Sequence, residues 1–260
     1  MLNFIPHHHL IIELTKRDFA SRYSGSFAGI IWSFIQPLFL LAVYTTAFGF
    51  ILKARWGATG STSEYALILF SGLIIFNLFS ECLTKSSSLV LANPNFVKKV
   101  VFPLWILPLV SALSAMTHAL IAILVWLLGY ILLFGLPHLT FLWFPVVLLS
   151  FFPVLLGVGW LLSAVGVYVR DIAQAAAMIS HTLLFLTPIF YSTAMVPEGL
   201  QRVIRINPLT FVVDQFRDVM FFGNAPDYGG LLVYFVCASV FAALCLYVFN
   251  RLRPSFADMV

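Results

Sequence analysis

The sequence predicts an all-α polytopic membrane protein with six transmembrane helices, and two observations support this fold class. Hydrophobic residues make up 62% of the 260 residues and charged residues only 9%, whereas an ordinary soluble domain has roughly 25% charged residues. The apolar residues also form runs long enough to cross a bilayer, for which about 20 residues suffice. We expect a single membrane domain over residues 1–260, with an N-terminal interfacial helix and two short re-entrant or interfacial helices between spans five and six.

Residues 10–23 carry an amphipathic pattern that predicts a helix in the membrane interface. Apolar residues such as Phe19 and Tyr23 recur at helical spacing, and Glu13 and Arg17 form a favourable i,i+4 pair on the polar side. A helix of this kind lies in the plane of the interface. It serves either as a membrane anchor or as a surface that a soluble partner grips.

Six apolar segments follow the interfacial helix and are predicted to span the membrane. In order, they are residues 27–52, 65–83, 104–134, 141–168, 172–191 and 229–249. Pro37 is expected to kink or loosen the first span, because it lacks a backbone donor. Small residues in the fourth span allow neighbouring helices to approach closely; they include Gly157, Gly159 and Gly166.

The distribution of positive charge predicts the orientation of the chain. An even number of spans puts both termini on one side of the membrane, and that side holds most of the Lys and Arg residues. Because these residues concentrate on the cytoplasmic side, both termini are expected to be cytoplasmic. Residues 192–228 then face outward. They carry too many charges for a lipid-facing span but include apolar stretches at 209–213 and 219–222, which favours two short helices.

No residues in the chain form a convincing catalytic or metal site. His118 and His181 each lie alone in an apolar run, which favours a histidine bonded to a nearby carbonyl. The adjacent histidines at 7–9 are interpreted as incidental, and the three cysteines lack metal-ligand spacing. Asp214, Arg217 and Asp218 have helical spacing and are interpreted as a local ion-pair set. The chain also lacks the G-x-x-x-x-G-K-[ST] phosphate loop, so it cannot hydrolyse ATP by that route.

A series of short motifs resembles a known family. In the second half the motifs are, in order, Arg170-Asp171-Ile172, Pro188-Ile189-Phe190-Tyr191, Val196-Pro197, Asn207-Pro208-Leu209 and Arg217-Asp218. In the first half they are residues 93–103 (NPNFVKKVVFP) and the combination of Arg22-Tyr23, Gly29, Trp32 and Gln36-Pro37. This ordered set resembles the ABC-2 type permeases that export polysaccharides such as O-antigen, capsule and teichoic acid, and it extends over nearly the whole chain.

The resemblance implies a homodimer in the bacterial inner (plasma) membrane with one translocation path. Two nucleotide-binding ATPase subunits would dock on the cytoplasmic face and would bind ATP and Mg, so that this chain needs no cofactor of its own. The other partners would be a lipid-linked glycan and membrane lipid, and not nucleic acid.

The resemblance also assigns roles to individual residues. Contact with the ATPase is implied for Arg17, Asp18, Arg22, Arg170 and Asp171. A short helix at the cytoplasmic gate is implied for Asn93, Pro94, Lys98 and Lys99. The aromatic residues implied along the path are Trp32, Phe34, Phe39, Tyr44, Phe185, Phe190 and Tyr191.

The leading functional hypothesis is therefore the membrane subunit of an ATP-driven exporter of lipid-linked polysaccharide, with O-antigen favoured over capsule or teichoic acid. Aromatic residues make up 16% of the chain, and aromatic rings stack on the apolar faces of sugars. An ABC-2 exporter of a small lipophilic molecule is an alternative, because such a path would also be aromatic. More distant alternatives are a membrane-embedded glycosyl- or acyltransferase and a passive channel.

Overall fold

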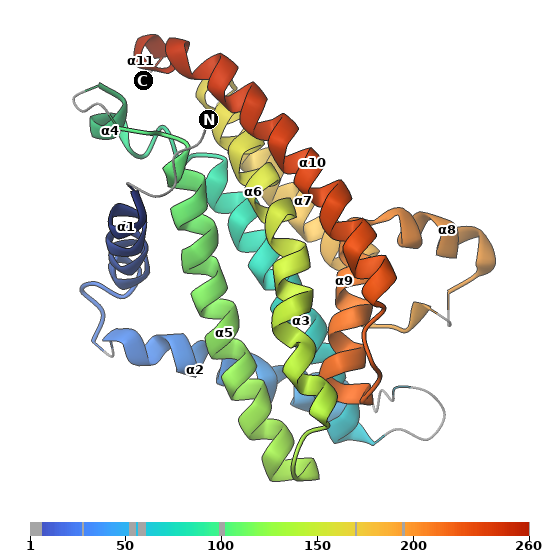
Figure 1. Ribbon diagram of the computed structural model, residues 1–260. Helices are drawn as coiled ribbons and strands as arrows, with labels where there is room; N and C mark the ends of the chain where they lie inside the picture. Colours follow the sequence, from blue (N-terminus) through green and yellow to red (C-terminus); the bar gives the residue numbers. More distant parts are fainter. Residues whose placement is uncertain are drawn as a thin grey trace.

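The computed structural model describes residues 7–27, 29–51, 56, 61–98, 102–169, 171–193 and 196–259, and within these ranges the chain forms helices and no strands (Figure 1). The predicted all-helical fold class is confirmed. Five helical runs are long and apolar enough to cross a membrane: Gly29–Phe48, Ser63–Ser86, Ile106–Phe134, Leu139–Tyr168 and Tyr228–Met259. They correspond to the first, second, third, fourth and sixth predicted spans.

Helix α3 (Thr62–Ser86) lies at the centre of the bundle. It begins with a capping box, in which the Glu64 amide donates to Ser61 Oγ and the Ser61 amide donates to the Glu64 carboxylate. Of its most apolar stretch, 83% is buried, far more than in the other long helices. The helices that cover it are α5 (Ile106–Phe134), α6 (Phe144–Tyr168), α7 (Ile172–Leu186) and α9 (Pro208–Arg217).

Glycines in α6 allow the close packing that the sequence predicts. A methyl group at Gly157 would lie 2.5 Å from the Phe241 ring of α10 (Tyr228–Leu252), and one at Gly159 would lie 3.2 Å from Pro108 of α5. At Gly166 a methyl group would come within 2.0 Å of the Ser87 carbonyl oxygen, which follows the end of α3. The predicted close approach of neighbouring helices to the fourth span is confirmed.

The first predicted span is not one regular α-helix. It consists of a 3-10 turn, η2 (Gly29–Ile31), then α2 (Trp32–Tyr44), and then a π-helical stretch, η3 (Thr45–Ile51). At the start of η3, the hydroxyl of Thr45 donates to the Leu41 carbonyl at 2.7 Å, a contact that competes with regular helix bonding. Figure 1 shows α2 crossing α5 at a steep angle instead of running along it.

The fifth predicted span, residues 172–191, ends early. Helix α7 has 15 residues, which at 1.5 Å per residue cover only about 22 Å of a core about 30 Å thick. The C-cap residue that follows it, Thr187, is extended, with φ −93° and ψ 137°. The reason is local: the ring of Pro188 disfavours helical geometry in the residue before it.

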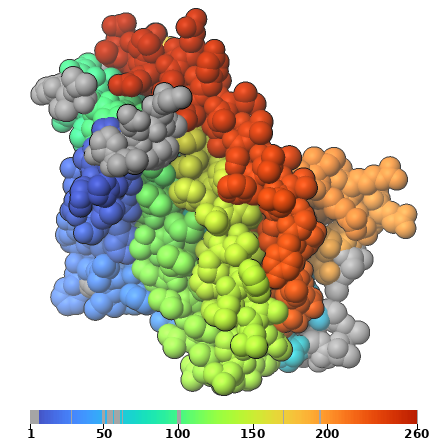
Figure 2. Space-filling view, in the orientation of Figure 1, coloured from blue at the N-terminus to red at the C-terminus, as the bar shows by residue number. Residues whose placement is uncertain are grey.

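Two short helices occupy the segment between the last two predicted spans, but the two apolar stretches that favoured them, 209–213 and 219–222, both lie in the second helix and its continuation. Helix α8 (Glu198–Ile206) projects from the side of the bundle, whereas α9 is buried against α3 and α6 (Figures 1 and 2). Asn207 separates them, and its side chain accepts a hydrogen bond from the Leu209 amide at 3.0 Å to cap α9. A π-helical stretch, η6 (Asp218–Phe222), follows α9 and ends at Gly223, with φ 71°.

The predicted N-terminal helix is present as α1 (His8–Ser21), and Figure 2 shows it on the flank of α5. Its Leu14 is buried in a cluster that includes Trp105 and Trp160. The short helices α4 (Pro94–Lys98) and α11 (Phe256–Met259) lie together at one end of the bundle (Figure 1). There the Arg253 guanidinium donates to the Phe102 carbonyl at 3.2 Å.

Candidate coupling and translocation sites

Two ion pairs attach α1 to α3. Lys85 Nζ lies 2.5 Å from the Asp18 carboxylate, and Arg22 pairs with Glu81. Both pairs are largely shielded from solvent, so they are screened less than surface pairs. Two of the residues predicted to contact an ATPase therefore bind within the chain, and α1 is held to the central helix.

Reversing one charge of the Asp18–Lys85 pair is expected to detach α1, because two like charges would then face each other. Asp18→Lys and Lys85→Asp should each speed the labelling of a Leu14→Cys reporter several-fold, and the double exchange should restore slow labelling. Lys16→Glu is the matched control, since Lys16 pairs with Glu13 on the exposed face of α1 and such a pair contributes below about 1 kcal/mol. Unchanged labelling in both single variants would contradict the role of the pair.

Another predicted coupling residue, Asp171, lies at the turn between α6 and α7. Asp171 is exposed at the start of α7, and its carbonyl accepts from the Ala175 amide at 3.0 Å. Arg170 lies outside the described residues. Tyr168, just before the turn, donates from its hydroxyl to the Leu252 carbonyl of α10 at 3.2 Å. The exposed carboxylate of Asp171 is available for contact with another subunit.

The predicted gate segment forms the expected short helix. Helix α4 begins at Pro94 and ends at Lys98, whose side chain is exposed. Asn93 Nδ2 donates to the Leu89 carbonyl at 2.8 Å and so fixes the turn that precedes α4. Lys99 lies outside the described residues.

An aromatic contact joins the gate segment to α1. The Arg17 guanidinium lies 5.8 Å from the centroid of the Phe96 ring, within the range of a cation–π contact. Phe96 also stacks on Phe102, with 4.5 Å between the ring centroids. Arg17, the third predicted coupling residue of α1, therefore contacts the predicted gate.

His118 differs from its sequence-based interpretation. Its Nδ1 lies 3.3 Å from both carboxylate oxygens of Glu81, and no carbonyl among the described residues bonds the ring. The pairing arises because α3 and α5 pack side by side and bring residues 81 and 118 together. The rings of Phe19 and Tyr23 cover His118 from α1 and the turn after it. Burial raises the pKa of the Tyr23 phenol, which Arg22 opposes, so that this hydroxyl is uncharged at neutral pH.

Some of the predicted path aromatics converge where η3 meets the end of α7. The Phe48 ring lies 6.2 Å from Tyr44 and is stacked on Phe190 at 5.4 Å, and Phe190 lies 5.9 Å from Phe185. Tyr191 donates from its hydroxyl to the Phe185 carbonyl at 2.8 Å. Phe48, which connects the two groups, was missed by the sequence analysis, although its i,i+4 spacing from Tyr44 was a usable signal.

The remaining predicted path residues do not join this cluster. Trp32, Phe34 and Phe39 lie on α2 with 46%, 41% and 65% of their surfaces exposed. Among the residues of α2, only Ser33 is buried. These three rings therefore face lipid or a partner, and not the interior of this subunit.

The buried residue Arg217 has contacts beyond the local ion pair that the sequence predicted. Its side chain is 2% exposed, and its Nη1 lies 3.9 Å from Asp214 Oδ1, which is the expected local ion pair. Its stronger contacts are with backbone carbonyls: Nη1 donates to Pro188 at 2.5 Å, Nη2 to Ile189 at 2.8 Å and Nε to Ile68 at 3.3 Å. The guanidinium thus ties the non-helical stretch after α7 to α3.

Two further residues shape the site of this arginine. A methyl group on Gly72 of α3 would lie 2.6 Å from Nη2 of Arg217, so the absence of a side chain there makes room for the guanidinium. The Trp56 ring lies 4.6 Å from the guanidinium carbon and covers it. Arg217 lies in a stretch that also holds the apolar residues Phe216, Val219 and Met220, but the sequence does not show which groups it contacts.

Comparison with known proteins adds a family and several relatives. The sequence model of the ABC-2 type transporter family matches residues 9–221. The O-antigen export system permease protein RfbA of Klebsiella pneumoniae is 25% identical over 253 residues, which cover 96% of this chain and 95% of that protein. The RfbA protein of Myxococcus xanthus is 22% identical over 253 residues, which cover 96% of this chain and 95% of that protein. The polysialic acid transport protein KpsM of Escherichia coli is 23% identical over 242 residues, 90% of each chain.

Proposed function

Because the chain belongs to the ABC-2 type transporter family, we propose that it is the membrane subunit of an ATP-driven exporter of lipid-linked polysaccharide. The favoured cargo is O-antigen, and the favoured location is the bacterial inner membrane. The observation that supports this cargo is the alignment of nearly the full chain with relatives named for O-antigen export and for polysialic acid transport. Both are long glycans. Capsule, teichoic acid or a small lipophilic molecule are the alternatives.

The proposed complex has two copies of this chain and two nucleotide-binding subunits that bind ATP and Mg. Exposed Arg17 and Asp171, with Arg170, would contact the ATPase at the cytoplasmic face. Each copy would cross the membrane six times, with α7 and the stretch that follows it as the fifth crossing. Both termini would then be cytoplasmic, and α8 and α9 would approach the membrane from outside.

The exposed face of α2 supports the proposed homodimer and path. Trp32, Phe34 and Phe39 lie on one helix that this subunit leaves almost uncovered. In a dimer with one central path, such rings would line the path or the contact with the second copy. The inner aromatic cluster around Phe48 and Phe190 would then support the same wall from behind.

Deleting this gene in its host is expected to remove one surface polysaccharide and to leave its lipid-linked form inside the cell. Immunoblots of surface glycan identify the cargo, and expression of the intact chain should restore it. Purification of the chain in mild detergent should recover a nucleotide-binding subunit in about equal amount. Unchanged surface polysaccharides, or an intact chain that recovers no such subunit, would contradict the proposal. Loss of resistance to a lipophilic compound alone would favour the small-molecule alternative.

A further inference from the structure

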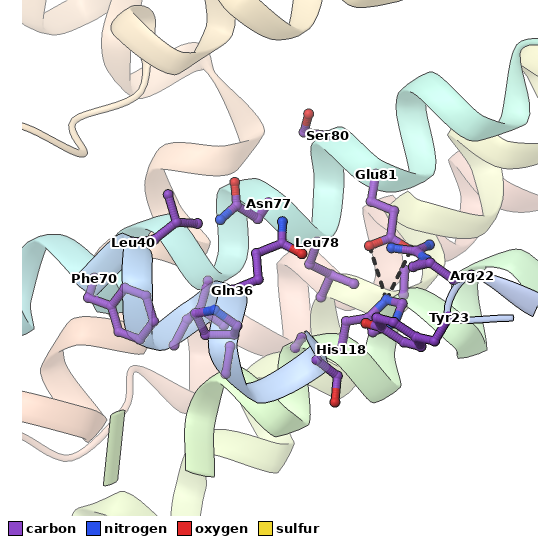
Figure 3. A pocket seen from close by; sticks show the side chains of 16 residues that line it. Arg22, Tyr23, Gln36, Leu40, Phe70, Asn77, Leu78, Ser80, Glu81 and His118 are labelled. Carbon is purple, nitrogen blue, oxygen red and sulfur yellow. Dashed lines mark hydrogen bonds and ion pairs between the residues drawn. The ribbon is translucent and has the colours of Figure 1, made fainter. Parts of the chain in front are cut away.

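A cavity of about 310 Å³ lies between α2, α3 and α5 (Figure 3). This volume is at the lower end of the range of small-molecule sites, about 300–1,000 Å³. One part of its wall is apolar and includes Leu40, Phe70 and Leu78. The remainder carries polar side chains that come from spans one, two and three and from the turn after α1.

Two of these polar side chains have no partner. The amides of Gln36 on α2 and Asn77 on α3 make no hydrogen bond to any described residue, and Figure 3 shows both in the space between the two helices. Both residues are exposed in this subunit, so their amides are free to bond a ligand that enters the cavity. Polar residues inside membrane spans commonly mark substrate pathways. Two exposed amides that line one cavity can therefore hold a ligand that both donates and accepts hydrogen bonds.

The charged groups at the other end of the cavity argue against an anionic ligand. Arg22 and His118 are the cationic or potentially cationic groups there, and both contact the Glu81 carboxylate. The arginine is thus neutralised within the chain, and a phosphate would meet the carboxylate as well. A metal ion is also disfavoured, since the described residues contain no group of three potential protein ligands.

We infer that this cavity is a binding site for a glycosyl residue of the transported polymer, held by Gln36 and Asn77 through its hydroxyl groups. Sugar hydroxyls are uncharged and both donate and accept, which matches the amides. Glu81 supplies a further acceptor, and the apolar wall suits the apolar face of a pyranose. The inference rests on the proposed function and names the part of the substrate that the cavity recognises.

The same geometry connects the site to α1. Glu81 lines the cavity and pairs with Arg22, at the end of the helix that Lys85 and Asp18 attach to the bundle. A sugar hydroxyl that bonds to Glu81 would compete with Arg22 for this carboxylate. Occupation of the cavity therefore weakens one of the two attachments of α1.

The test uses the purified complex of this chain with its ATPase in lipid nanodiscs. The first probe is the oligosaccharide released by mild acid from the host's own lipid-linked polymer, and the second is polyprenyl pyrophosphate without sugar. Calorimetric titration is expected to show binding of the oligosaccharide, which Gln36→Leu and Asn77→Leu each weaken about tenfold, equivalent to about 1.4 kcal/mol. Asn250→Leu, an amide outside this cavity, is the control and should bind like the wild type.

Two results would overturn the inference. In the first, both leucine variants bind the oligosaccharide with the affinity of the wild type and also melt at the wild-type temperature. In the second, the wild type binds polyprenyl pyrophosphate but no oligosaccharide, and both leucine variants bind polyprenyl pyrophosphate more weakly. If the ATPase copurifies and deletion of the gene removes a surface glycan, such a result refutes the cavity site and leaves the proposed function standing. Failure of those two experiments refutes the function itself.

Discussion

Replacing Arg217 with alanine is expected to lower the stability of the protein by ~3 kcal/mol or more. The substitution leaves the carbonyls of Ile68, Pro188 and Ile189 without their donor in a buried site, and each unsatisfied buried group costs about 1–3 kcal/mol. It also empties a volume that Trp56 covers. The stretch after α7 would lose its attachment to α3, and the aromatic cluster around Phe190 would lose its support.

Thermal unfolding in detergent, followed by the loss of monodisperse protein, measures this effect. Arg217→Lys should recover only part of the stability, because one ammonium group lacks the planar fork that reaches several carbonyls at once. Arg202→Ala is the matched control, since Arg202 is exposed on α8, and it should melt like the wild type. Gly72→Ala tests the same site from the other side, because its methyl group would displace the guanidinium. A wild-type melting temperature in both Arg217→Ala and Gly72→Ala would refute this account.

Gly166→Ala is expected to be the second most damaging change, although it adds only one methyl group. That methyl would lie 2.0 Å from the carbonyl oxygen of Ser87 and 3.0 Å from its carbonyl carbon. Both atoms belong to the backbone, so α6 must move away from the end of α3. Overpacking of a core commonly costs about 1–3 kcal/mol, and a clash with backbone falls at the upper end because no side chain can rotate aside.

The matched control for this prediction is Gly199→Ala on α8, where an added methyl group would meet nothing within 4 Å. It should leave the melting temperature unchanged or raise it slightly, because alanine favours the helix. Gly157→Ala should fall between the two, since its closest neighbour is the Phe241 side chain, which can rotate. We expect the melting temperature to fall in the order Gly199→Ala, Gly157→Ala, Gly166→Ala. Equal melting temperatures for all three variants would contradict this prediction.

Local signals predicted the helical elements well. The short helices α1, α4 and α9 occur where amphipathic spacing or an Asn-Pro step indicates them. These signals act over a few residues: periodicity selects the face of a helix, and proline disfavours helix in the residue before it. The same rule explains the early end of α7, because the Pro188 that ends it was visible in the sequence. Composition suggested a continuous span there, but the local backbone preference prevailed.

Functional side chains were predicted less well, because their partners are distant in the sequence. Asp18 and Arg22 were predicted to contact an ATPase subunit, yet their ion pairs are with α3 of the same chain. His118 was interpreted without Glu81, which is 37 residues away. Of the predicted path aromatics, Phe190 enters an inner cluster and Trp32 stays outside. Residue type alone does not distinguish these two positions.

The sequence by itself determined that this is a helical membrane protein, where its apolar runs lie and which family it belongs to, because hydropathy, periodicity and ordered motifs are properties of the chain. Only the tertiary structure decided what these elements do to one another. It placed Arg217 against a carbonyl 149 residues away and brought the unpaired amides of Gln36 and Asn77 to one cavity. Such pairings depend on how helices pack, and packing is set by the shapes of all the helices together.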